Sequence, residues 1–201
     1  MTSFLALDFE ATERYPVHAR IVQVGLARFD GGNLAEASGR LVDPGVPIPR
    51  GARAVHGIGD EHVAGEDCVA EVLPRLLSRL RGALVVGYCV IDYDLELLRA
   101  ECRRHGFRAE YAETMASLRG VVDAFPFAAA TSKAPRYQKG ARTLATMSRS
   151  RGIVLDKAHD AAADAVAVGE LALALVAEGA MPPLQEAAEA LASTWRHLKA
   201  P

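Results

Sequence analysis

The sequence predicts an α/β protein in which short strands come first and helices follow. Apolar runs typical of strands lie at residues 4–7, 20–29, 34–42 and 83–86, whereas apolar side chains in most later segments recur at the intervals of amphipathic helices. The chain has 201 residues, 50% of them hydrophobic and 24% charged. That length and composition are typical of one globular domain whose core needs neither disulfides nor a structural metal.

Charge and cysteine content narrow the class of protein. Cys68, Cys89 and Cys102 form no Cys-x-x-Cys pair, and we interpret them as buried thiols of a reducing compartment. An acidic residue occurs within the first 8 positions and no run of about eighteen apolar residues is present, so we expect a cytoplasmic protein without a membrane span. The net charge of −2 excludes a strongly basic nucleic-acid binder, although carboxylates gathered around cations would create their own local field.

The first predicted strand ends in two carboxylates. The apolar run 4–7 leads into Asp8 and Glu10, which are separated by one residue. Because side chains alternate along a strand, both acids are expected on the same face of the sheet.

Three strands and one helix are predicted to follow. The strands at 20–29 and 34–42 flank an Asp-Gly-Gly-Asn turn at 30–33, so strands one to three should form an antiparallel meander. Apolar residues spaced by three and four predict an amphipathic helix over 69–80. This helix leads into a short buried strand at 83–86.

A further helix is predicted over residues 93–105, and two acids lie near its start. Asp92 is a suitable N-cap, which would place Asp94 in the first helical turn. A carboxylate in that turn is favoured by the helix dipole whether or not a metal is bound. Position alone therefore leaves a structural and a functional role open for Asp94.

The remaining helices are predicted at 142–151, 160–178 and 184–198. Residues 125–142 show neither helical nor strand periodicity, and we interpret them as a long loop that is either functional or merely tolerated. The last helix follows Pro182 and Pro183 and is amphipathic, so it docks either on this domain or on a partner; packing on the same domain is the simpler expectation.

A third group of polar residues lies at the start of the predicted helix over 160–178. His159 and Asp164 would lie about 140° apart if both were helical, so they converge best with His159 in the preceding loop and Asp164 pointing inward. The surrounding alanines would let this helix approach the sheet closely and bring Asp164 near the first strand. Simple helix propensity also explains those alanines.

These three groups have the chemistry of a two-metal site for phosphodiester hydrolysis. Carboxylate oxygens suit Mg²⁺ or Mn²⁺, which stabilise the attacking and departing oxygens of such a reaction. A histidine is the natural general base for the attacking water at neutral pH, and His159 is the candidate. No cluster of histidines and cysteines suggests zinc.

Residues 3–178 resemble the DEDDh branch of the DnaQ-like 3′-to-5′ exonucleases, which includes RNase T and oligoribonuclease. The residues that match its three motifs, in chain order, are Asp8, Glu10, Thr12, Asp94, Leu97, Leu98, His159 and Asp164. Residues 55–58, Val-His-Gly-Ile, also resemble a segment of this family, and Thr114–Met115 lies where the family usually has an Asp-Thr pair, with Glu113 in place of the aspartate.

The middle motif departs from the family pattern. Tyr88 and Cys89 stand where His-Asn is common, and one extra residue precedes Asp94. A shifted register would make Asp92 the metal ligand instead, although only Asp94 keeps the spacing to the following leucine pair. His56 is similarly ambiguous, because a tight turn before Gly57 explains it as well as a place near the substrate groove does.

The resemblance implies a ribonuclease H-like fold, with a mixed five-stranded sheet flanked by helices. An antiparallel meander of the first three strands would be extended by parallel strands. Residues 1–180 would form the exonuclease domain, and residues 181–201 would form a helical extension packed on it.

The resemblance also implies an activity and a set of site residues. The protein is expected to release nucleoside 5′-monophosphates from the 3′ ends of single-stranded DNA or RNA. Two divalent cations, Mg²⁺ or Mn²⁺, would be held by Asp8, Glu10, Asp94 and Asp164, with His159 as the general base. Substrate contacts are expected from Phe9, Ala11, Thr12 and Tyr15, the last by stacking on a base. A homodimer or a polymerase partner is also implied.

Two alternative functions come from other classes. An apolar strand that ends in an acid-x-acid-x-Thr pattern also opens the haloacid-dehalogenase-type phosphatases, but Glu10 replaces their second aspartate and the late His159 and Asp164 have no part in that chemistry. The fold could also serve as a catalytically silent module that binds nucleic acid or a polymerase. A missing ligand would favour that alternative, and none of the family's ligands is missing.

Overall fold

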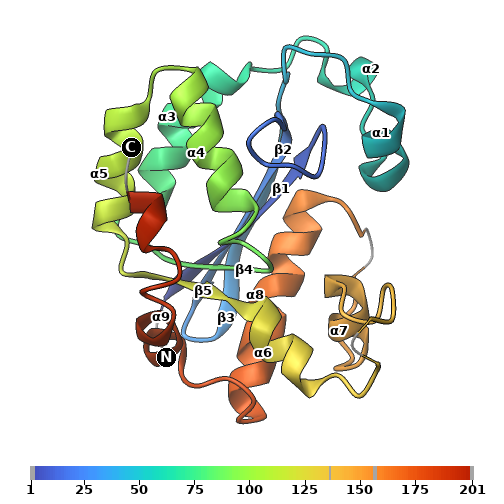
Figure 1. Cartoon of the computed structure of the whole chain (residues 1–201), viewed down its shortest axis with the longest axis vertical. Coiled ribbons are helices and arrows are strands. Elements are labelled where there is room, and N and C mark those ends of the chain that lie inside the picture. Colours follow the sequence, from blue (N-terminus) through green and yellow to red (C-terminus); the bar gives the residue numbers. More distant parts are fainter. Residues whose placement is uncertain (1–2, 136, 156–157, 200–201) are drawn as a thin grey trace.

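A mixed five-stranded sheet forms the centre of the protein. The computed structural model describes residues 3–135, 137–155 and 158–199. The strands are β1 (Phe4–Ala11), β2 (Ile21–Asp30), β3 (Asn33–Leu41), β4 (Leu84–Gly87) and β5 (Gly120–Asp123). They lie in the order β3-β2-β1-β4-β5, with β1–β2 and β2–β3 antiparallel and β1–β4 and β4–β5 parallel (Figure 1). The predicted meander and mixed sheet are confirmed.

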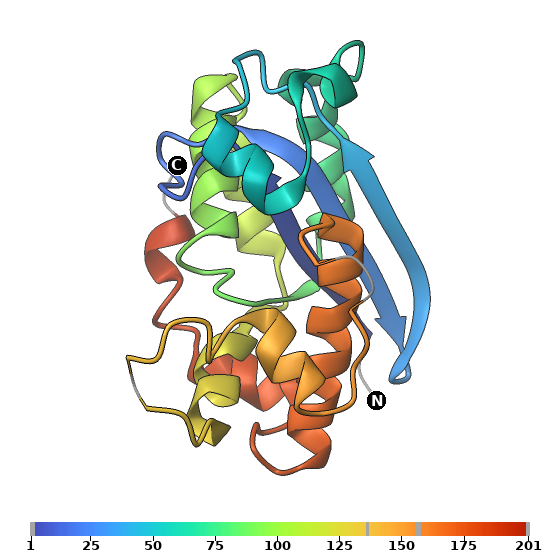
Figure 2. The same cartoon turned by 90° about the vertical axis from the view of Figure 1, so that its right-hand side faces the viewer.

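Helices cover both faces of this sheet, as Figures 1 and 2 show. The helices are α1 (Arg50–His56), α2 (Asp60–Val63), α3 (Val69–Leu80), α4 (Asp94–Arg104), α5 (Arg108–Ser117), α6 (Ala124–Thr131), α7 (Leu144–Arg149), α8 (Ala161–Ala177), α9 (Leu184–Ala190) and the 3₁₀ helix η1 (Arg196–Lys199). Helices α3, α4 and α5 pack on one face, and α8 with α6 and α9 pack on the other. In the part of the chain that the structure describes, no helix is long and apolar enough to cross a membrane.

Side-chain alternation along β1 separates the core into two layers. Leu5, Leu7 and Phe9 are buried against α3 and α4, whereas Phe4 and Ala6 are buried against α8. Asp8 and Glu10 follow Phe4 and Ala6 at every second position of the strand, so both carboxylates lie on the same face, the one that α8 covers. Their shared face is as predicted. At the far end of the meander, Gly31 and Gly32 both have positive φ, which suits a two-residue hairpin turn.

The start of α8 packs directly on the backbone of the sheet. A Cβ atom on Gly25 of β2 would lie 1.9 Å from the carbonyl oxygen of Ala161, and one on Gly39 of β3 would lie 3.0 Å from the Cβ of Ala162. Glycines on the strands and alanines on the helix therefore make the close approach possible. This confirms the predicted proximity of the helix to the sheet.

The predicted loop over residues 125–142 is wrong in its first part, because α6 occupies Ala124–Thr131. Asp123 caps this helix by accepting a hydrogen bond from the amide of Phe125. Pro126 lies in the first turn, where a missing N–H costs little, and the alanines that follow favour a helix.

The predicted helix over residues 184–198 is also too long. The α-helix ends at Ala190, and after a run of turns only η1 is helical. The hydroxyl of Thr194 donates to the carbonyl of Leu191, a local bond that competes with helix continuation. Trp195 and Leu198 are buried in the core beside α4 and α5, so this segment packs on the same body.

Two smaller expectations also change. Asp92 is not the N-cap of α4: it is exposed, and Tyr93 holds that position without a side-chain cap bond among the described residues. Of the three cysteines that were expected to be buried, Cys102 is buried and Cys89 is partly buried, whereas Cys68 is exposed at the start of α3. Thr114 and Met115 lie on the buried face of α5. Their match to the family's usual Asp-Thr pair stays a prediction.

Candidate active site

Four carboxylates meet where β1 ends beside α4 and α8. Asp8 and Glu10 come from β1, Asp94 is the first residue of α4, and Asp164 lies in the first turn of α8. Asp94 is buried, and its Oδ1 accepts a hydrogen bond of 2.9 Å from the amide of Phe9. Since Asp92 is exposed, the structure brings Asp94 and not Asp92 against β1.

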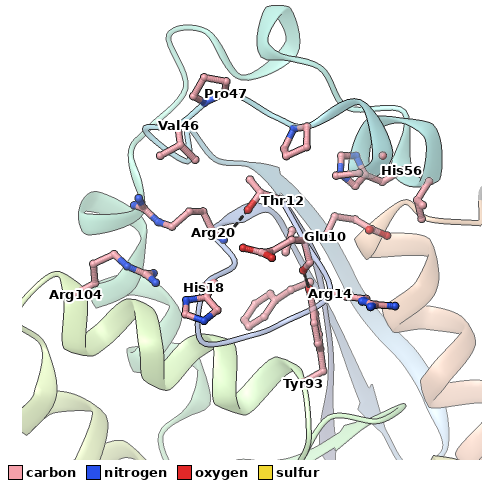
Figure 3. A pocket seen from close by; sticks show the side chains of 17 residues that line it. Glu10, Thr12, Arg14, His18, Arg20, Val46, Pro47, His56, Tyr93 and Arg104 are labelled. Atoms are coloured by element: carbon pink, nitrogen blue, oxygen red, sulfur yellow. Dashed lines mark hydrogen bonds between the residues drawn. The ribbon is translucent and has the colours of Figure 1, made fainter.

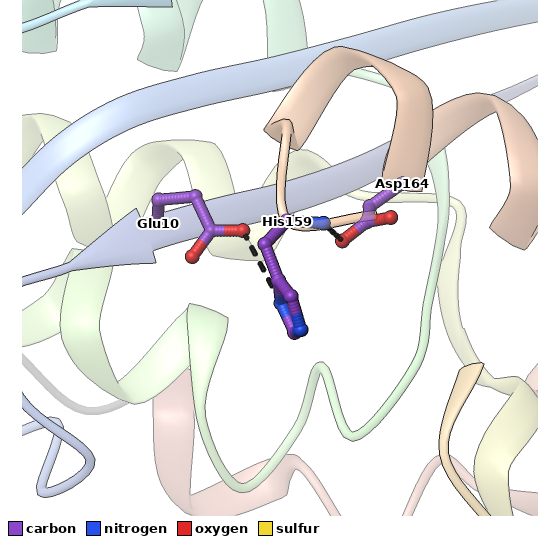
Figure 4. A group of neighbouring side chains, drawn as sticks. All are labelled: Glu10, His159 and Asp164. Carbon is purple, nitrogen blue, oxygen red and sulfur yellow. Dashed lines mark hydrogen bonds and ion pairs between the residues drawn. The ribbon is translucent and has the colours of Figure 1, made fainter. Parts of the chain in front are cut away.

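His159 faces this group from the loop before α8, as predicted. Its Nδ1 lies 4.0 Å from Oε1 of Glu10, and its side chain is 54% exposed (Figure 4). Its backbone has φ of +65°, a conformation that few residues other than glycine adopt. The amide of His159 donates to Oδ2 of Asp164 at 3.1 Å, so that carboxylate fixes the backbone which carries the imidazole.

The donor set fits divalent cations. One ligand atom from each of Glu10, His159 and Asp164 lies within 4.8 Å of the others. The second oxygen of Asp164, Oδ1, is buried and has no hydrogen-bond partner among the described residues. A buried carboxylate oxygen left unpaired beside other carboxylates is stabilised by a hard cation, which accepts oxygen ligands of this kind.

Burial and mutual repulsion raise the pKa values of all four acids. Desolvation raises the pKa of Glu10 to about 8, with the Asp164 and Asp160 carboxylates adding to the shift. Burial also raises the pKa of Asp164 to about 6, although the bond from the His159 amide opposes the change. The pKa values of Asp8 and Asp94 are likewise well above normal, chiefly through burial. A cation would reverse these shifts by favouring the ionised forms.

A cavity of about 1060 Å³ opens next to Glu10 (Figure 3). The segment Phe9–Arg14 lines it, together with residues from the loop before α1 and from α4. Thr12 is buried, and its Oγ1 accepts from the amide of Arg20, which closes the β1–β2 connection. Phe9, Ala11 and Thr12 all line the cavity, and their contact with a substrate stays a prediction.

Tyr15 lies apart from this cavity lining. It is 54% exposed, its hydroxyl accepts from Arg14, and the Arg14 guanidinium lies 4.7 Å from its ring centroid. Its stacking on a base stays a prediction. Tyr93 lines the cavity instead, and its hydroxyl donates to the carbonyl of Glu13.

His56 is a cavity residue that the sequence left ambiguous. Its Nδ1 accepts from the amide of Ile58 at 3.0 Å, so Nε2 carries the proton. That Nε2 is buried, with no partner of standard hydrogen-bond geometry in the described part of the chain. Burial lowers the pKa of His56, although the nearby backbone of Ala11 opposes the shift. Both earlier interpretations are therefore compatible: His56 closes a turn and also lines the cavity.

The strand order and the carboxylates at the end of β1 define a ribonuclease H-like fold with a candidate metal site. The sequence model of the RNase_T family, described as exonuclease, matches residues 5–172. The chain therefore belongs to the RNase_T exonuclease family, which confirms the resemblance seen in its motifs.

Curated relatives and solved structures agree with this assignment. The chain is 27% identical over 169 residues to the PolC-type DNA polymerase III of Streptococcus thermophilus, covering 84% of this chain and 11% of that protein. It is 37% identical over 100 residues to a DNA polymerase III subunit epsilon-like protein of Rhodobacter capsulatus, covering 48% of this chain and 14% of that protein. E. coli Exonuclease I, solved with a dT13 oligonucleotide, shares the fold with a TM-score of 0.75 at 22% identity, covering 88% of this chain and 41% of that one.

Proposed function

We propose that this chain is a metal-dependent 3′-to-5′ exonuclease that releases nucleoside 5′-monophosphates from single-stranded 3′ ends. The observation that carries the proposal is the gathering of four carboxylates, with the exposed His159 next to Glu10 and Asp164. Glu10 also lines the large cavity. Membership of an exonuclease family supports it. The dT13 oligonucleotide bound to E. coli Exonuclease I favours single-stranded DNA over RNA as the first substrate to test.

Asp8, Glu10, Asp94 and Asp164 would hold two divalent cations, and their oxygen donors favour Mg²⁺ or Mn²⁺. When bound, such cations activate a water molecule and stabilise the charge that develops on the departing 3′ oxygen. The protein contributes by fixing these ligands before substrate arrives. Asp94 is held by the Phe9 amide, and Asp164 by the His159 amide.

His159 would accept the proton of the attacking water. Its imidazole is exposed on the side of Glu10, so it can reach a water at the site without displacing core residues. The loop position leaves the ring accessible, while the bond to Asp164 restrains its backbone.

The cavity would receive the terminal nucleoside. Its lining segment Phe9–Thr12 includes Glu10, so a sugar in the cavity would place its 5′ phosphate near the carboxylates. His56 lines one side, and Arg20 and Arg104 lie on another (Figure 3). We place Phe9, Ala11 and Thr12 in substrate contact on this basis. Association with a polymerase belongs to the same proposal, because the two relatives named above are DNA polymerase III proteins. A second copy of this chain is the alternative partner that the motif resemblance implies.

The test is digestion of 5′-labelled single-stranded DNA and RNA of matched sequence, with Mg²⁺, with Mn²⁺ and with EDTA. A ladder that shortens one nucleotide at a time and requires metal supports the proposal. Asp8→Asn should abolish the ladder while its circular dichroism and unfolding midpoint show a folded protein. Binding without cleavage by the unmodified protein would favour the silent module. Neither binding nor cleavage would direct attention to small phosphate esters.

A further inference from the structure

Gln23 on β2 lies directly opposite Glu10 on β1 and is buried. Its side chain makes two hydrogen bonds to the start of α8. The carbonyl oxygen Oε1 accepts from the amide of Ala161 at 3.0 Å, and the amide nitrogen Nε2 donates to Oδ2 of Asp160 at 3.3 Å. One glutamine thus uses both its acceptor and its donor on two consecutive residues.

Asp160 is at the same time the N-cap of α8. Its other oxygen, Oδ1, accepts from the amide of Ala163 at 3.1 Å. The first amides of a helix have no partner within the helix, and here Gln23 and Asp160 together satisfy two of them. The start of α8 is therefore bonded to β2 at the strand position that pairs with Glu10.

The residues on either side of this connection are the two candidate site residues of α8. His159 directly precedes Asp160, and Asp164 lies one turn further along the helix. Their mutual bond, from the His159 amide to Asp164, ties them into one unit. The packing of Ala161 on Gly25 sets how close this unit lies to the sheet, and the two bonds of Gln23 set where it lies along the strand.

We propose that Gln23 is a positioning residue, which holds His159 and Asp164 in register with Glu10; the inference rests on the proposed function. The chemistry requires an amide. A glutamate could still accept from Ala161, but it would place a carboxylate against that of Asp160. A hydrocarbon side chain would leave the Ala161 amide without its partner.

Gln23 is the donor and Asp160 the acceptor in the hydrogen bond between them, and a pair of substitutions can reverse these roles. The test uses this reversal. Gln23→Glu alone opposes two carboxylates, and Asp160→Asn alone presents a second donor to Nε2 of Gln23. In the double variant Gln23→Glu/Asp160→Asn, the asparagine can donate to the new glutamate while its oxygen still caps Ala163. Gln185→Glu on α9 is the matched control for the Gln-to-Glu change.

The measurement is kcat and KM on single-stranded DNA, with the unfolding midpoint of each variant. Each single variant should lose about tenfold to a hundredfold in kcat with KM changed less, since misplacement of catalytic groups acts on turnover. The double variant should recover most of kcat, and Gln185→Glu should match the unmodified protein. Unchanged kcat in Gln23→Glu, or no recovery in the folded double variant, would overturn the proposal.

A second readout separates this inference from the proposed function. The imidazole NMR signals of His159, assigned by their loss in His159→Ala, should shift in both single variants and return in the double variant. If the unmodified protein cleaves neither DNA nor RNA, the proposed function fails, and these signals still decide the role of Gln23. Signals that stay in place in Gln23→Glu would show that it does not position His159.

Discussion

His159 has an unfavourable backbone conformation, and its side chain is exposed at the candidate site. Its φ of +65° is a conformation that costs a residue with a Cβ about 1–2 kcal/mol. A glycine removes this cost, although its greater freedom in the unfolded chain offsets part of the gain. Such strain is retained where surrounding contacts enforce it, here the bond from the His159 amide to Asp164.

His159→Gly is therefore expected to be more stable than His159→Ala by about 1 kcal/mol. Both variants lack the imidazole, so both should lose exonuclease turnover to a similar extent. Urea unfolding of the two proteins, followed by circular dichroism, provides the comparison. Equal stability, or a more stable alanine variant, would mean that the left-handed conformation is not enforced in solution.

Asp94 and Asp92 differ in their surroundings although only one residue separates them. Asp94 is buried beside Asp8 and accepts from the Phe9 amide, whereas Asp92 is exposed. Asp94→Asn keeps an oxygen that can accept this bond but removes the charge that a cation requires. It should therefore lower kcat by roughly a hundredfold or more, while Asp92→Asn stays near the unmodified value. Steady-state assays on the same labelled DNA measure both, and a larger loss in Asp92→Asn would shift the metal ligand to that residue.

At the scale of elements, the docking of α8 on β2 decides whether the site can form. In the variant Gly25→Ala, the added Cβ would overlap the carbonyl of Ala161. Overpacking of this kind should destabilise the protein by about 3 kcal/mol and lower turnover, because α8 carries His159 and Asp164. Gly51→Ala is the control, since its Cβ would meet no atom within 4 Å and alanine favours the helix α1. Gly51 lines the cavity, so it is a control for stability alone. Urea unfolding compares the stability of the two variants, and the assay on labelled DNA measures the turnover of Gly25→Ala. Equal unfolding midpoints would show that α8 adjusts freely.

The elements that could be predicted from the sequence are those whose apolar residues recur at a regular interval or whose turn residues are distinctive. Helix α3 has the predicted bounds, Val69–Leu80, and buries the six apolar residues of its stripe. The Gly31–Gly32 turn likewise predicted that the strands on either side of it, β2 and β3, would pair as antiparallel neighbours. By contrast, β5 was not placed from its own residues, because only Val121 and Val122 are large and apolar in this strand, which is too short a run to mark it. Helix α6 was hidden because Pro126 and a run of alanines give no apolar stripe.

The candidate site shows the same limit. Asp8, Glu10, His159 and Asp164 could be proposed because spacing and the family motifs identify them. Gln23 and Asp160 could not, since their hydrogen bond joins residues 137 positions apart and depends on how α8 lies on β2. The exposure of Asp92 and the burial of Asp94 likewise depend on the turn between β4 and α4, whose shape the sequence does not specify.

At the scale of the whole molecule, the site makes stability depend on both pH and metal. The pKa of Glu10 is raised to about 8 and that of Asp164 to about 6. At a pH between the ordinary pKa of each group and its raised pKa, the folded protein therefore binds more protons than the unfolded chain does. The contribution of these two acids to stability is then greatest in acid, and it is lost as pH rises through the raised pKa values. His56 acts in the opposite direction, because burial lowers its pKa.

We therefore expect the free energy of unfolding in EDTA to fall by a few kcal/mol between about pH 5 and about pH 8, since one pKa unit corresponds to about 1.4 kcal/mol. Mg²⁺ binds the ionised carboxylates and should restore stability more at pH 8 than at pH 5. Glu10→Gln separates this effect from that of His56, because it should flatten the decline in EDTA. Urea unfolding across this pH range, with and without Mg²⁺, measures all of these. A free energy in EDTA that rises steadily to pH 8 would mean that the carboxylates are not held together in the metal-free protein.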